Sequence, residues 1–102
     1  MKNSQWELLL GLANRAQKVI SGEALVLKEI RSGRAKLVLL SEDASLNTKK
    51  KLQDKCLHYN VMLYYVANRE LLGHAIGKEA RVTVALLDEG FAKKLASLLD
   101  ES

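Results

Sequence analysis

The chain has 102 residues, and its 48% apolar content is that of one folded domain, spanning residues 1–102, and excludes a disordered chain. It has no apolar run near the roughly 20 residues of a membrane helix and no secretory apolar segment at its start, so we expect a cytoplasmic protein with no membrane partner. It has only one cysteine, so no intrachain disulfide is expected. The net charge of +4 is concentrated between Asn14 and Arg81, where thirteen Lys or Arg accompany seven Asp or Glu, and this favours a polyanionic partner.

The first predicted element is a helix that begins at a capping box of Ser4 and Glu7 and ends near Arg15 or Ala16. One face of this helix is apolar at helical spacing, with Trp6, Leu9, Leu10 and Ala13. A short strand is expected from Lys18 to Ser21.

A second helix is predicted from Glu23 to Ser32, between two glycines. Gly22 opens it, and Gly33 suits the left-handed position that ends a helix. Its inward residues are expected to be Val26, Leu27 and Ile30. The run from Lys36 to Leu40 is apolar throughout, which is typical of a strand buried on both faces.

The second half of the chain continues the alternation of helices and strands. A helix capped by Ser45 or Asn47 is expected to run to about Tyr59, with an apolar stripe of Leu52, Cys56 and Tyr59, and a strand follows from Val61 to Val66. A helix capped by Asn68 is expected to run to about Ala75, and a strand follows from Arg81 to Leu87. The last expected element is a helix capped by Asp88, with Phe91, Leu95 and Leu98 facing inward. Strands separated by helices predict the α/β class and a three-layer α/β/α sandwich.

The segment from Ser21 to Ser45 carries the clearest functional pattern. A helix start presents unpaired N–H groups and the positive end of the helix dipole, and Gly22 has no side chain to keep a phosphate away. Four cations follow within fifteen residues: Lys28, Arg31, Arg34 and Lys36. From this pattern alone, an ordinary strand–helix–strand unit with a solvated basic face remains the alternative.

Two blocks of sequence resemble a known family. The first block comprises Gly22, Val26, Lys28, Ile30, Gly33, Ala35 to Val38, Glu42 and Asp43, and the second comprises Leu72 to Lys78, Arg81 and Val82. This chain is similar to the kink-turn-binding ribosomal proteins of the L-seven-Ae and L-thirty-e type, and most of all to their small bacterial YlxQ-type members. The resemblance implies a four-stranded mixed sheet and a cytoplasmic RNA-binding protein. We expect this protein to be monomeric, non-enzymatic and ribosome-associated. Its implied partners are structured RNA such as a ribosomal kink turn, and ribosomal proteins.

The resemblance also implies an RNA-binding surface in two parts, the start of the second helix and the loop before the last strand. The candidate residues are Gly22, Glu23, Ala24, Leu25, Lys28, Arg31, Lys36, Ile76, Gly77, Lys78 and Arg81. In the family an Asn-Glu pair that reads base edges stands where this chain has Ala24 and Leu25, so base specificity is expected to be reduced more than phosphate binding. The loop is expected to pack against an extruded nucleotide, although Ile76, as an isoleucine, favours the core.

The remaining polar and reactive residues favour neither an enzyme nor a cofactor site. Cys56 and His58 are two residues apart on a predicted helix and do not share a face, and Glu42 and Asp43 lack the glycine loop of a phosphate site. We therefore expect no catalytic residues, no metal and no cofactor. The basic helix face of Lys49, Lys50, Lys51 and Lys55 is either solvated surface or a contact to distant phosphates. The principal alternative function is a protein–protein adaptor that uses Ala24 and Leu25 as an apolar contact, and a small-molecule enzyme comes third.

Overall fold

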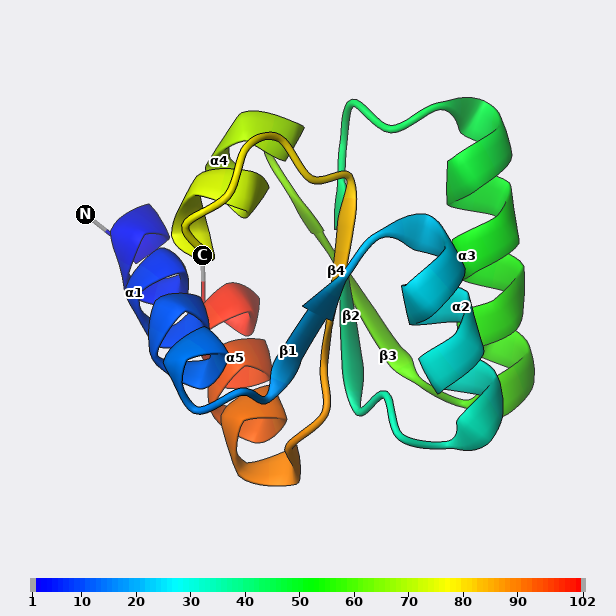
Figure 1. Ribbon diagram of the computed structural model, residues 1–102, viewed down its shortest axis with the longest axis horizontal. Coiled ribbons are helices and arrows are strands. Elements are labelled where there is room, and N and C mark those ends of the chain that lie inside the picture. The colour runs from blue at the N-terminus through cyan, green and yellow to red at the C-terminus, as the bar shows by residue number, and fades with distance from the viewer. Residues whose placement is uncertain (1, 102) are drawn as a thin grey trace.

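The computed structural model describes residues 2–101, with side chains from residue 5 onward, as a three-layer α/β/α sandwich (Figure 1). Its middle layer is a four-stranded mixed sheet in the order β1-β4-β2-β3. The strands are β1 (Val19–Ser21), β2 (Leu37–Ser41), β3 (Met62–Val66) and β4 (Thr83–Leu86). β4 is antiparallel to both of its neighbours, β1 and β2, whereas β2 and β3 are parallel. The predicted fold class and sheet are confirmed.

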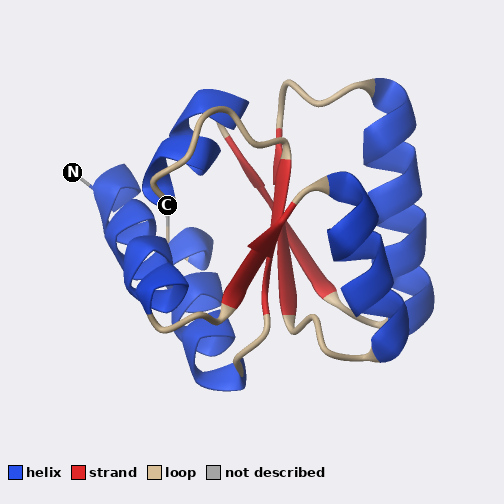
Figure 2. Ribbon diagram, in the orientation of Figure 1, coloured by secondary structure: helices blue, strands red, loops and turns tan. Residues whose placement is uncertain are grey.

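In the part of the chain that the structure describes, five helices cover the two faces of this sheet (Figure 2). One face carries α1 (Lys2–Arg15), α4 (Arg69–Ala75) and α5 (Glu89–Asp100), and the other carries α2 (Glu23–Ser32) and α3 (Leu46–Tyr59). Among the described residues, no helix has the length and apolar character needed to cross a membrane.

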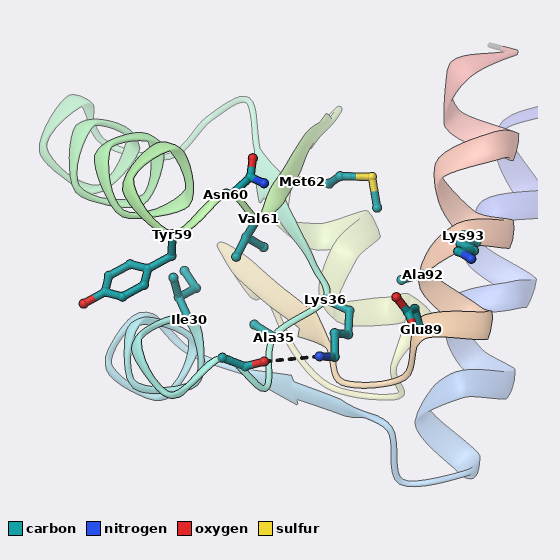
Figure 3. A pocket seen from close by; sticks show the side chains of 11 residues that line it. Ile30, Ala35, Lys36, Tyr59, Asn60, Val61, Met62, Glu89, Ala92 and Lys93 are labelled. Atoms are coloured by element: carbon teal, nitrogen blue, oxygen red, sulfur yellow. Dashed lines mark hydrogen bonds between the residues drawn. The ribbon is translucent and has the colours of Figure 1, made fainter.

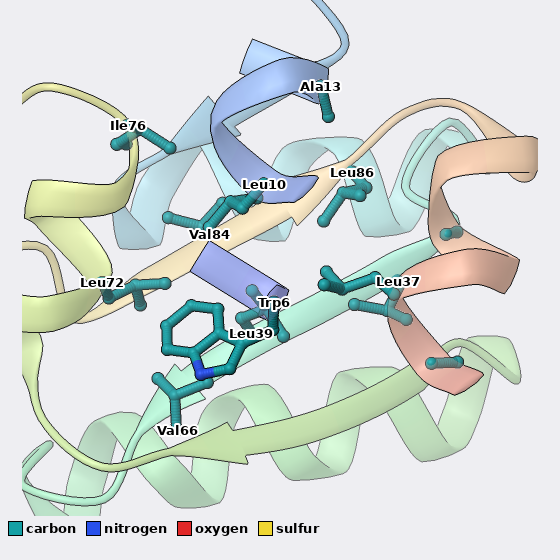
Figure 4. Close-up of a cluster of buried hydrophobic side chains, with 13 residues drawn as sticks. Trp6, Leu10, Ala13, Leu37, Leu39, Val66, Leu72, Ile76, Val84 and Leu86 are labelled. Atoms are coloured by element: carbon teal, nitrogen blue, oxygen red, sulfur yellow. The ribbon is translucent and has the colours of Figure 1, made fainter. Parts of the chain in front are cut away.

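Alternate side chains of β2 enter two separate cores, and this explains its apolar sequence. Leu37 and Leu39 pack with Trp6 and Leu10 of α1 and with residues of α4 and α5 (Figure 4). Val38 and Leu40 pack on the other face, in a cluster that includes Ile30 of α2, and Leu52 and Cys56 of α3. Because both faces of the sheet are covered, every residue of β2 is buried, as expected.

The predicted helix ends agree closely with the structure because each has a side-chain or glycine signal. Ser45, Asn68 and Asp88 accept from the backbone N–H three residues later, so these three N-caps are confirmed. Gly33 and Asn60 end α2 and α3 in the left-handed conformation. Strand ends differ from the predictions by one or two residues because ladder pairing, and not local sequence, decides them.

Two predicted details are wrong. The first helix begins at Lys2, so Ser4 lies within α1 and is not its N-cap; the Ser4 side chain lies outside the described residues. Tyr59 is 41% exposed and does not complete the apolar stripe of α3, because α3 ends there, at the margin of the sheet.

Topology gathers the ends of several elements along one margin of the sheet, which we call the carboxyl edge. β1, β2 and β3 end there, β4 begins there, and α2, α3 and α4 therefore also begin there. The opposite edge contains the turn from Gly33 to Lys36 and the start of α5. In sheets of this kind, side chains that follow strand ends are brought together at one edge.

Candidate nucleic-acid interface

The start of α2 lies at the carboxyl edge and has no side-chain cap. Gly22 adopts φ 101° and ψ 141°, a conformation that favours glycine, and its N–H donates to Thr83 O at 3.1 Å. With glycine as N-cap, none of the described side chains accepts from the N–H groups of the first turn. These N–H groups, on Glu23 to Leu25, remain donors for a ligand at the positive end of the helix dipole.

The outer face of α2 displays the residues that sequence periodicity assigns to it. Val26 and Ile30 are fully buried, whereas Ala24 and Lys28 are exposed and Leu25 is 41% exposed. The expected position of Lys28 on the polar face is therefore confirmed. Leu25 also lies outside the core, so its side chain is open to a partner or to substitution.

Glu23 joins the start of α2 to α3 instead of standing free. Its Oε1 accepts from Thr48 Oγ1 at 2.8 Å, and its Oε2 accepts from Lys51 Nζ at 3.1 Å. The Thr48 hydrogen bond, followed by that of Lys51, holds the pKa of the Glu23 carboxyl below its usual range. Two of its lone pairs are thus engaged within the protein.

The loop from Ile76 to Arg81 begins in the core and then turns outward. Ile76 is only 5% exposed and packs in the cluster with Leu10 and Leu72, so the core interpretation of this residue holds (Figure 4). Gly77 and Lys78 are exposed, and Gly77 has φ +70° with open space around it. The outward part of the loop, and not Ile76, therefore forms its accessible surface.

A small residue at Gly73 lets this loop fold back on α4. A Cβ at Gly73 would lie 1.8 Å from the carbonyl oxygen of Glu79, a distance that no side chain allows. The N–H of Lys78 donates to Gly73 O at 2.9 Å, and the N–H of Arg81 donates to Arg69 O at 3.0 Å. The loop is therefore held at both ends.

Arg81 brings the two predicted parts of the surface together. Its Nε donates to Ser21 Oγ at 3.3 Å, and its Nη1 donates to Ala80 O at 2.9 Å. A cavity of about 350 Å³ lies between them. The cavity is lined by Gly22, Glu23, Ser45, Thr48, Arg69 and Ala80 to Thr83. Residues some sixty positions apart in sequence thus share one site.

Two candidates, Arg31 and Lys36, are not at this site. Helix α2 carries the chain away from the carboxyl edge, so Arg31 lies in its last turn. Lys36 lies at the opposite edge, where its Nζ donates to Gly33 O at 3.2 Å beside a separate cavity of about 290 Å³ (Figure 3). These two cations are close to Gly22 in sequence but not in the folded protein.

Arg69 is a cavity residue that the sequence interpretation missed. Its Nη2 donates to Asp43 O at 2.7 Å, and its Nε lies 3.4 Å from Asp43 Oδ2. The Ser41 hydroxyl, followed by the N–H and charge of Arg69, lowers the pKa of the Asp43 carboxyl. The available signal was topological: Arg69 opens a helix that follows a strand ending at the same edge.

The remaining reactive side chains have structural surroundings. Burial raises the pKa of the Cys56 thiol to about 11, so the nucleophilic thiolate is scarce at neutral pH. Within the described residues, no three His, Cys, Asp or Glu side chains are grouped to hold a metal ion. Asp43, one of the two adjacent carboxylates after β2, is paired with Arg69.

Comparison with known proteins relates this site to a family. Residues 4–96 match the Ribosomal protein L7Ae/L30e/S12e/Gadd45 family. The chain is 64% identical over 100 residues to the RNA-binding protein YlxQ of Bacillus subtilis (strain 168), covering 98% of this chain and all of that protein. It is 42% identical to the RNA-binding protein YlxQ of Enterococcus faecium, covering 90% and 88% of the two chains.

A solved structure agrees with these relationships. A protein of unknown function from Bacillus halodurans C superimposes with a TM-score of 0.92 at 49% identity, covering 94% of this chain and 97% of that one. The two YlxQ proteins are named for RNA binding and not for an enzymatic reaction, in agreement with a non-enzymatic protein. The match over most of the chain confirms the resemblance seen in the sequence, and this chain belongs to the Ribosomal protein L7Ae/L30e/S12e/Gadd45 family.

Proposed function

We propose that this protein is a monomeric RNA-binding protein of the cytoplasm that recognises structured RNA containing a kink turn, on or near the ribosome. The observation that supports this most strongly is the convergence of two separate chain segments on one cavity. Gly22 N–H reaches Thr83 O, Arg81 reaches Ser21, and both segments line the same cavity. A surface built from a helix start and a loop suits an RNA whose bases are displaced from a regular duplex.

The chemistry of this edge favours contacts to the RNA backbone. The N–H groups of the first turn of α2 and the exposed cations Lys28 and Lys78 are suitable donors to phosphate oxygens. No carboxylate among the described side chains forms an ion pair with Arg81, so its charge also acts on the cavity. An extruded base would enter beside Arg81, whose planar guanidinium can stack on or donate to it.

Side chains at this edge offer fewer hydrogen bonds to bases than those of family members that carry the Asn-Glu pair. Ala24 and Leu25 are exposed in the position that the Asn-Glu pair takes, and neither side chain can hydrogen bond to a guanine edge. Backbone donors and the loop are then the principal source of specificity. We therefore expect a smaller preference for kinked over unkinked RNA than in members that carry Asn-Glu.

The test is direct binding to two RNAs that differ in the kink. Fluorescence-labelled kink-turn RNA and a fully paired duplex of the same length are titrated with the protein at two salt concentrations. We expect tighter binding to the kink turn, with affinity falling steeply as salt rises because cations displace counterions. Equal affinity for both RNAs would refute kink recognition, and salt-insensitive or absent binding would refute RNA binding.

One feature favours an adaptor function, although on a different surface from Ala24 and Leu25. Leu8 and Leu12 on α1 are 70% and 53% exposed and line a cavity of about 600 Å³ between α1 and α4. An apolar side chain of a partner protein would fit there. If the protein is an adaptor, replacing Leu12 by Glu should abolish binding of the partner protein and leave the affinity for RNA unchanged.

A further inference from the structure

The helices α2 and α3 lie side by side on the same face of the sheet (Figure 1). Both follow strands that point in the same direction, so the two helices are roughly parallel. The contacts of Glu23 with Thr48 and Lys51 show which sides of the helices adjoin. The junction between them therefore leads away from the proposed RNA edge.

Further along the two helices, basic side chains lie beside this junction. Residues four apart lie on the same side of a helix, so the row of Glu23 continues through Leu27 to Arg31, and the row of Lys51 continues to Lys55. Arg31 is exposed and its Nε donates to Leu27 O at 3.4 Å, which keeps the guanidinium near the junction. We call Lys28, Arg31, Lys51 and Lys55 the α2–α3 ridge.

The ridge is positive because the acidic side chains beside it are already paired. Glu23 pairs with Lys51, the buried Glu29 lies 3.4 Å from Arg34, and Asp54 lies 3.8 Å from Lys50. No carboxylate among the described side chains forms an ion pair with Lys28, Arg31 or Lys55. Three cations of the ridge are therefore uncompensated on one helical layer.

The dimensions of the ridge suit a nucleic-acid backbone. From Glu23 to Arg31 the helix rises about 12 Å, at about 1.5 Å per residue. Double-stranded DNA carries a phosphate charge about every 1.7 Å of its axis, and an RNA stem has a comparable charge density, so several phosphates lie within such a length. Lys28 belongs to both the proposed edge and the ridge, and so connects the two surfaces.

We propose that the α2–α3 ridge binds the phosphate backbone of the RNA stem that continues from the kink, with Arg31 and Lys55 as its distal contacts. This inference rests on the proposed function and extends it from the carboxyl edge to the outer face of α2 and α3. The ridge adds affinity without reading sequence, since phosphate contacts position the RNA. In this proposal Arg31 contacts RNA, although it lies away from the cavity at the carboxyl edge.

The experiment compares two double variants on two RNAs. Arg31→Gln with Lys55→Gln removes both distal cations, and Lys93→Gln with Lys94→Gln removes the same charge from exposed positions on α5, in the opposite layer. Each is titrated with a kink-turn RNA carrying a long stem and with one whose stem is cut back to the kink, at several salt concentrations. Thermal melting by circular dichroism checks that both variants are folded.

The ridge variant should bind the long-stem RNA several-fold more weakly than wild type. Its logarithmic salt slope should be smaller by about 0.7–0.9 for each lost phosphate contact. The short-stem RNA should show little difference, and the α5 variant should resemble wild type on both RNAs. A ridge variant with wild-type affinity and slope on the long-stem RNA would overturn the ridge and leave the proposed function standing. Failure of wild-type protein to bind either RNA would overturn both.

Discussion

The start of α2 and the loop from Ile76 to Arg81 line the same cavity, but different forces hold them in place. The helix is held by its own backbone ladder and by the burial of Val26 and Ile30. The loop has no such regular hydrogen bonding and depends on a few contacts, such as the one from Arg81 to the distant Ser21 and the local one from Lys78 to Gly73. Substitutions on the outer face of α2 should therefore change recognition alone, whereas backbone changes in the loop should displace part of the site.

The largest expected effect comes from Gly77→Val. Gly77 has φ +70°, where a β-branched residue is strongly disfavoured, so the outward part of the loop must rearrange. We expect loss of kink-turn binding in a fluorescence titration. Gly33→Val is the matched control in a titration with RNA whose stem is cut back to the kink, because Gly33 also has a positive φ of +82° and open space but lies at the opposite edge. Full affinity in Gly77→Val would exclude the loop from the interface.

The second prediction concerns base reading by α2. Replacing Ala24 by Asn and Leu25 by Glu should increase the preference for kinked over unkinked RNA, since a good base contact contributes about 1–3 kcal/mol and about 1.4 kcal/mol is tenfold. Both positions are exposed, so the variant is expected to fold. Leu57→Glu, at an 84% exposed position near the end of α3, controls for the added charge. A folded double variant with unchanged preference would contradict the proposed orientation of α2.

The third prediction concerns a single phosphate contact. Lys28→Ala should weaken RNA binding by a few-fold and reduce the logarithmic salt slope by about 0.7–0.9. Its melting temperature should be unchanged because the side chain is exposed. Lys94→Ala, at an exposed position on α5, is the matched loss of charge. If Lys28→Ala binds every RNA tested as wild type does, Lys28 is not in the site.

The smallest effect concerns Glu23 and pH. Its pKa is lower in the folded protein than the ordinary value of 4.5, so its contacts contribute stability above that pH, and this contribution is lost as pH falls through the folded pKa. Glu23→Gln should therefore lower the melting temperature slightly at pH 7, by the equivalent of about 0.2–1 kcal/mol for a surface pair, and less at pH 3. Glu42→Gln is the control at a neighbouring exposed carboxylate. A difference that grows on acidification would contradict the assignment.

The elements held by local contacts could be predicted from the sequence, whereas those held by tertiary contacts could not. The bounds of α2 were predicted in full because glycines flank it and its apolar residues follow helical spacing. The last strand was predicted to start at Arg81, but it starts at Thr83, because Arg81 bonds to Arg69 and Ser21 instead of joining the ladder. Such contacts depend on the tertiary fold and leave no local pattern.

The candidate site divides in the same way. The exposure of Lys28 follows from helical periodicity, whereas the burial of Ile76 follows from the packing of α4 against α1. Arg31 and Lys36 were grouped with Gly22 by sequence distance alone, yet a helix of ten residues spans about 15 Å and ends at the other edge. Arg69 was missed because its proximity to Arg81 requires the sheet order to be known.

The most direct test of the account follows backbone amides by NMR during titration with kink-turn RNA whose stem is cut back to the kink. If the helix start and the loop form one RNA-binding edge, the amide signals of residues 22–28 and 77–81 should shift together at the same RNA concentrations. Signals at the opposite edge, from Gly33 to Lys36, should remain unchanged. Shifts confined to the opposite edge or to the α1–α4 cavity, with residues 22–28 and 77–81 unaffected, would contradict the account.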